Sequence, residues 1–83
     1  MKYEIGKKVV VVVTFNRQLL GAIGTLLNFD TRIHMASGHT EKVWYVEMND
    51  LETVCVSQWQ LRHITARDKC FSVNGRNYVA IAP

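Results

Sequence analysis

Five consecutive valines at residues 9–13 are the feature that most restricts how this 83-residue chain can fold. Each of them is β-branched, and β-branched side chains favour extended strands over helices. The next apolar run, residues 19–29, contains Gly21 and Gly24. Each glycine would cost a helix about 1 kcal/mol relative to alanine. We therefore expect a first strand in the valine run, a turn at Gly21 and a second strand after it.

Turn residues divide the rest of the chain into short apolar segments. A polar loop after Phe29 and Asp30 is expected to separate the second strand from a third one at residues 33–36. Asn74-Gly75 is the strongest turn indicator because both residues tolerate positive φ. Further strands are expected at residues 42–48, 53–56, 71–73 and 78–82, and residues 57–66 fit a short helical turn as well as a strand. This pattern predicts one all-β domain across residues 1–83, of the small-barrel type.

Three of the expected strands, residues 9–13, 43–46 and 78–82, are apolar on both faces. A strand with one face in water alternates apolar and polar residues. The second face of these strands is therefore covered either by the rest of the chain or by neighbouring subunits. A chain of this size has a small core, and association with further copies would add stability. We therefore expect a homo-oligomer.

Composition excludes several classes of protein. No apolar stretch reaches the roughly 18 residues of a membrane helix, so no membrane partner is expected. The net charge of +3 is compatible with a polyanionic partner, but the basic residues form no block. Cys55 and Cys70 are expected to be reduced, partly buried thiols in a cytoplasmic protein, since nothing in the sequence indicates export.

Residues for metal binding or catalysis are not grouped. The histidines and cysteines lack CxxC or HxxxH spacing, which metal sites commonly use. The serines lie in no nucleophile-elbow sequence, no glycine-rich phosphate loop occurs, and the carboxylates are scattered. We expect a protein that is not an enzyme and that has no metal or other cofactor.

Two segments resemble the motifs of the Sm/LSm family. Residues 24–35, GTLLNFDTRIHM, are similar to its first motif: a glycine, an apolar residue, an aromatic-aspartate pair, then an aliphatic, an asparagine and an aliphatic. Residues 73–83 are similar to the second motif, in which arginine-glycine precedes an apolar strand. His34 stands where the family has asparagine, and Asn74 stands where it has arginine.

The Sm-like resemblance implies a strongly bent five-stranded barrel with little or no N-terminal helix. Such barrels close into rings of about five to seven subunits. The ring would bind single-stranded RNA, or DNA, on its inner face between the loops of the two motifs, in RNA processing or regulation. Asp30 would end the second strand and brace its loop. The nucleic-acid-binding residues implied by the resemblance are Asp30, Arg32, His34, Asn74, Gly75 and Arg76.

The chemistry of these side chains suits a single strand. A guanidinium such as that of Arg32 can stack on a base and attract phosphate. His34 and the amide of Asn74 can bond base edges, and Arg76 can meet a phosphate. Ordinary structural roles are open as well: Asp30 can cap a turn, His34 can be a surface histidine, and Asn74-Gly75 needs no role beyond the turn.

A second resemblance gives the alternative interpretation. The glycine turn GAIGTL at residues 21–26 is similar to that of KOW/SH3-like domains. On this interpretation residues 6–64 form a complete barrel, with residues 59–64 as its closing turn and strand, and the C-terminal hairpin is an addition. The implied function is protein binding in the transcription or translation machinery. Solution mass discriminates the two, because a ring contains five to seven subunits or so and the alternative is a monomer or dimer.

Overall fold

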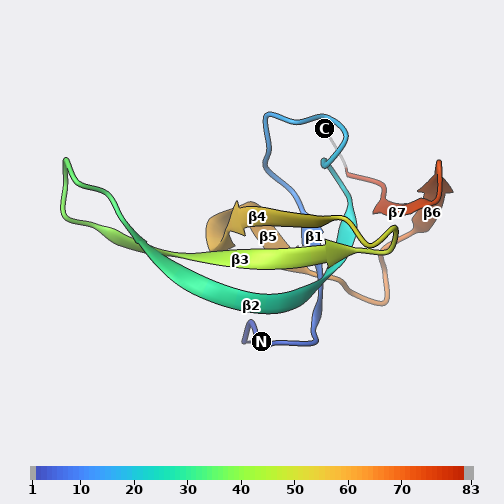
Figure 1. Ribbon diagram of the computed structural model, residues 1–83. Helices are drawn as coiled ribbons and strands as arrows, with labels where there is room; N and C mark the ends of the chain where they lie inside the picture. The colour runs from blue at the N-terminus through green and yellow to red at the C-terminus, as the bar shows by residue number, and fades with distance from the viewer. Residues whose placement is uncertain (1, 82–83) are drawn as a thin grey trace.

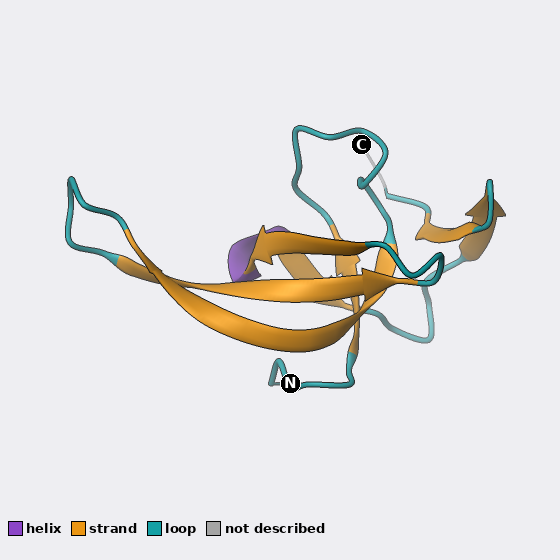
Figure 2. Cartoon of the chain, viewed as in Figure 1, coloured by secondary structure: helices purple, strands orange, loops and turns teal. Residues whose placement is uncertain are grey.

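Antiparallel strands make up most of the regular structure in the computed structural model, which describes residues 2–81 (Figure 1). The elements are β1 Lys8–Val11, β2 Ile23–Ile33, β3 Thr40–Met48, β4 Thr53–Ser57, the 3-10 helix η1 Gln58–Gln60, β5 Leu61–His63, β6 Cys70–Val73 and β7 Arg76–Val79. No α-helix occurs in residues 2–81 (Figure 2), and none of the described residues forms a helix long and apolar enough to cross a membrane. The all-β prediction is confirmed.

The first five strands form one antiparallel sheet with the order β4-β3-β2-β1-β5. All five strands contribute to a single apolar cluster. Its largest member is the fully buried Trp44, whose indole nitrogen donates a hydrogen bond of 2.8 Å to the Gln58 side chain. The other buried members are Val9, Val11, Ala22, Leu26, Val46, Met48, Val56 and Leu61. The sheet therefore bends around one core.

β2 is longer than the sequence predicted. It runs from Ile23 to Ile33 without the polar loop expected after Asp30. A register shift between Leu26 and Asn28 marks a bulge, after which β2 stays paired with β3 as far as Ile33 and Thr40. Residues 28–42 form an arm that extends beyond the rest of the sheet, and all of them are exposed except the half-buried Glu41 (Figure 1).

The C-terminal hairpin, β6 and β7, forms a separate two-stranded sheet. Val79 packs against Val10 and Ile23 in a second apolar cluster, with Ile81 at its margin. Val10 lies on the face of β1 opposite to Val9 and Val11, because side chains alternate along a strand. The apolar outer face of β1 is thus covered within the chain, and β1 gives no reason to invoke a neighbouring subunit.

The sheet ends before the second Sm-like motif begins. β5 is the last strand of the five-stranded sheet along the chain and ends at His63. Residues 73–81 lie outside that sheet. η1 and β5 also resolve the ambiguous residues 57–66 into a short 3-10 turn followed by a strand. They occupy the range that the SH3-like interpretation gave to a closing turn and strand, but this topology identifies neither family.

Candidate functional site

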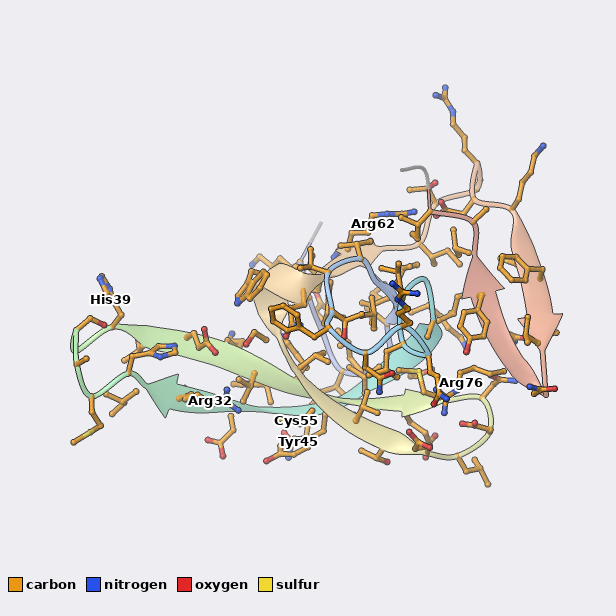
Figure 3. The ribbon with its side chains drawn as sticks, turned by 90° about the horizontal axis from the view of Figure 1, so that it is seen from above. Arg32, His39, Tyr45, Cys55, Arg62 and Arg76 are labelled. Atoms are coloured by element: carbon orange, nitrogen blue, oxygen red, sulfur yellow. The ribbon has the colours of Figure 1, made fainter. Side chains whose placement is uncertain are left out.

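The six residues implied by the Sm-like resemblance lie in two separate places. Asp30, Arg32 and His34 belong to the arm, whereas Asn74, Gly75 and Arg76 belong to the β6–β7 hairpin. The arm and the hairpin project from opposite ends of the molecule (Figure 1). Figure 3 shows Arg32 and Arg76 on opposite halves of the chain. One chain therefore does not bring the two motifs together into a single pocket.

Glu41 interacts with the polar side chains of Arg32, His34 and Ser57. Its carboxylate lies 3.7 Å from Arg32 Nη1 and 3.1 Å from His34 Nε2. It also accepts a hydrogen bond of 2.7 Å from the Ser57 hydroxyl. The Ser57 hydrogen bond, followed by the one from His34, lowers the pKa of Glu41 below its usual value. Arg32 and His34 are thus tied to a carboxylate of their own chain.

Asp30 does not have the role that the sequence predicted. It lies within β2, three residues before the strand ends, and its Oδ1 accepts a hydrogen bond of 2.8 Å from the Thr31 N–H. It neither terminates the strand nor contacts the hairpin loop. The prediction that Asp30 ends the second strand is therefore wrong, and its side chain bonds the adjacent backbone of β2 instead of the hairpin loop.

The hairpin turn is held by the turn between β3 and β4. Asn74 and Gly75 have φ values of 51° and 82°, as the sequence predicted for this turn. The Asn49 side chain donates to the Gly75 carbonyl and accepts a hydrogen bond of 2.8 Å from the Asn77 N–H. This contact fixes the hairpin relative to the five-stranded sheet.

Arg76 is a structural cation. It is 9% exposed, and its Nη2 lies 2.9 Å from Asp50 and 3.2 Å from Glu52. Burial opposes the charged form of Arg76, but the Asp50 hydrogen bond and the two carboxylates outweigh it and raise its pKa. Burial likewise opposes the charge of Asp50, yet the Arg76 hydrogen bond holds its pKa below the usual value. The expectation that Arg76 contacts a phosphate conflicts with this pairing.

An open groove of about 480 Å³ lies between the hairpin, the loop after β1 and the turn after β3. Phe71 and Tyr78 are paired across the hairpin, and their rings stack with centroids 5.8 Å apart and planes 17° apart. The Tyr78 hydroxyl donates a hydrogen bond of 2.7 Å to the Gln18 carbonyl, which holds the loop against the hairpin. The lining residues are Arg17, Gln18, Asp50, Phe71, Val73, Asn74, Arg76 and Tyr78.

Three carboxylates on the loops that adjoin the hairpin, Asp50, Glu52 and Asp68, are already paired. Asp68 accepts two hydrogen bonds from Arg62, at 2.8 and 2.9 Å, and these hold the pKa of Asp68 well below its usual range. Asp50 and Glu52 are paired with Arg76, as described above. Three cations on the loops beside the hairpin have no ion pair within residues 2–81, and they are Arg17, Arg67 and Lys69. This end of the chain therefore carries a surplus of positive charge.

Sequence reasoning missed Phe71, Tyr78 and Arg17. The pairing of the first two could have been predicted from the sequence. A two-residue Asn-Gly turn fixes the hairpin register and so places residues 71 and 78 opposite each other. The place of Arg17 in the groove could not have been predicted in this way. It lies in the loop after β1 and reaches the groove only because the chain folds that loop onto the hairpin.

The two cysteines lie on different sheets as free thiols. Cys55 is in β4 and Cys70 is in β6, and both are exposed. The prediction that they are partly buried is therefore wrong. Residues 2–81 contain no group of three or more histidine, cysteine or carboxylate side chains placed to hold a metal ion.

The chain matches no protein-family model, no curated protein and no solved structure. The Sm-like and SH3-like similarities therefore stay resemblances of short motifs.

Proposed function

We propose that the protein binds single-stranded nucleic acid without catalysis, with RNA as the first candidate, and that it binds in the groove beside the hairpin. The observation that carries this proposal is the stacked pair of the exposed Phe71 and the half-buried Tyr78, next to Arg17, which has no ion pair within residues 2–81. The groove volume lies within the range of pockets that hold small ligands, and a nucleotide is of that size.

The aromatic rings provide a surface for stacking. Phe71 is 49% exposed, so one side of its ring remains available to a base. Stacking of a base on an exposed aromatic side chain contributes about 1–3 kcal/mol and tolerates any base. The amide of Asn74, at the rim of the groove, can bond a base edge. A duplex hides these faces of its bases, so the groove favours unpaired nucleotides.

The charges support a polyanion. Arg17 lies in the groove wall, and Arg67 and Lys69 lie in the loop that leads into β6. Asp50, which also lines the groove, is neutralised by Arg76 and repels phosphate less than a free carboxylate would. The arm is less suitable, since Glu41 offsets the charge of Arg32 and lies 3.1 Å from His34 Nε2.

The test compares matched substitutions at the two ends of the molecule, by fluorescence anisotropy with labelled U-rich and A-rich oligonucleotides. Phe71→Ala should weaken binding about tenfold or more, because it removes a stacking surface. Arg17→Ala should reduce the slope of log affinity against log salt by about 0.7, the loss of one phosphate contact to a single strand. Phe29→Ala and Arg32→Ala are the matched controls on the arm, where Phe29 is 45% exposed.

The controls separate the competing interpretations. Unchanged binding by Phe29→Ala and Arg32→Ala supports the groove. A larger loss of affinity with the arm variants would place the binding site on the arm. Three of the six residues implied by the Sm-like resemblance lie there. Absence of binding at low salt would contradict the proposed function and favour the SH3-like, protein-binding alternative.

A further inference from the structure

β4 is an edge strand without the usual protection against pairing. It lies at one end of the five-stranded sheet and pairs only with β3. Its five residues, TVCVS, include no charge, no proline and no glycine. Natural edge strands commonly carry lysine, proline or a bulge, because an unprotected edge is open to another strand.

The hydrogen-bond pattern shows which groups of β4 face outward. Met48 N–H donates to the Glu52 carbonyl at 2.8 Å, so these two residues occupy a hydrogen-bonded position of the ladder just before β4, although the Met48 carbonyl accepts from Leu51. Such pairs alternate along an antiparallel ladder, so the backbone groups of Thr53, Cys55 and Ser57 point away from β3. The Ser57 N–H confirms this direction, since it donates to its own Gln60 side chain at 2.9 Å. The outward groups of Thr53 and Cys55 have no such partner within residues 2–81.

We propose that β4 pairs antiparallel with β4 of a second copy of this chain, on a two-fold axis at Cys55. Antiparallel pairing of a strand with itself places residues at equal distances from the axis opposite each other. The order TVCVS suits this arrangement, because valine then faces valine and Thr53 faces Ser57 of the second copy. The two Cys55 residues exchange both N–H···O bonds across the axis.

The residues that flank β4 also favour a second copy. Leu51 and Trp59 are 77% and 62% exposed, and each lies four residues from Cys55 on either side. Two-fold pairing of β4 brings the turn of one chain that carries Leu51 toward η1 of the other, which carries Trp59. Glu52 meets the neutral Gln58 end rather than a like charge. The residue order and the charges of β4 and its flanks are therefore self-complementary about Cys55. A partner of unrelated sequence would not require this symmetry.

Sedimentation equilibrium of the wild type and of two single variants, one at each cysteine, tests this proposal. The 9.5 kDa chain should sediment with twice its own mass. Cys55→Lys should give a monomer, because two lysines would face each other at the axis, and the exposed position leaves the core intact. Cys70→Lys is the matched control, an exposed cysteine on a strand of the other sheet, and it should leave the dimer unchanged. A monomeric wild type, a wild-type mass of several subunits, or equal effects of both variants would overturn the proposal.

Disulfide trapping provides a second readout that does not depend on the folding of the lysine variant. Opposed residues of a hydrogen-bonded pair have Cα atoms about 5.5 Å apart, within the range of disulfides. With an added copper–phenanthroline oxidant to take up the two electrons, Cys70→Ser should form a covalent dimer through Cys55. Cys55→Ser should form it far more slowly through Cys70. Equal rates of cross-linking would overturn the two-fold axis at Cys55.

Discussion

Gly21 lies where the loop after β1 meets the C-terminal strand, at a φ of 80°. Its carbonyl accepts a hydrogen bond of 2.8 Å from Val79 N–H, and a Cβ at this position would lie 2.6 Å from the Val79 carbonyl oxygen. Gly21→Ala should lower the free energy of unfolding by about 2–5 kcal/mol, because it adds a clash to an unfavourable backbone conformation. Urea unfolding measures this change.

Gly38→Ala is the matched control for the backbone effect. Gly38 has a φ of 70°, but no atom lies within 4 Å of its would-be Cβ. This substitution should cost only about 1–2 kcal/mol. Equal costs at the two glycines would show that the close approach of Val79 is unimportant for stability.

Asp68 makes the stability of the chain depend on pH. Hydrogen bonds from Arg62, and then from the Thr65 backbone, hold the pKa of Asp68 below its unfolded value. A carboxyl with a lowered folded-state pKa stabilises the fold above the unfolded pKa, and this contribution is lost as the pH falls. The difference in unfolding free energy between wild type and Asp68→Asn should therefore be largest at neutral pH and should shrink below about pH 4. A difference independent of pH would contradict the ion pair.

At the scale of the element, single side chains on both faces, among them Val79 and Arg76, hold the C-terminal hairpin to the rest of the chain, and other hairpin side chains stay exposed. Val79 is 2% exposed against Val10 and Ile23, whereas Val73 on the same hairpin is 47% exposed. Val79→Ala should lower the free energy of unfolding by about 2 kcal/mol, through lost burial and a cavity. Val73→Ala should change it by less than about 0.5 kcal/mol. If Val79→Ala instead changed the solution mass and left stability unaltered, Val79 would belong to a subunit interface.

At the scale of the whole molecule, the arm and the hairpin groove are separable. The arm beyond Asp30 and Val43 contributes no buried apolar residue to either core cluster. Replacing residues 31–42 by Asn-Gly, a turn that fits a two-residue hairpin, should therefore leave a cooperatively folding protein. Its affinity for single-stranded oligonucleotides should equal that of the full chain. A folded variant that no longer binds would place the nucleic-acid site on the arm.

The sequence by itself determined the strand-rich fold and its turns. Val9–Val11 of β1, the turn at Gly21 and the turn at Asn74-Gly75 follow from backbone and χ1 preferences that act within one or two residues. The same preferences predicted a strand through residue 13, but β1 ends at Val11. The same local preferences predicted the 3-10 turn only as one of two choices, since residues 57–66 have no clear period. The length of β2 was missed because pairing with β3 overrides the local polarity of Asp30 and its neighbours.

Only the tertiary structure decided what each outward side chain meets. The second apolar face of β1 has two physical solutions, a neighbouring subunit or a segment of the same chain, and the packing of Val79 on Val10 selects the latter. Arg76 has the same chemistry whether it is free or paired, but Asp50 lies beside it only after the turn following β3 docks on the hairpin. Contacts between residues that are far apart in the chain depend on the whole fold, and a local pattern of residue types contains no information about them.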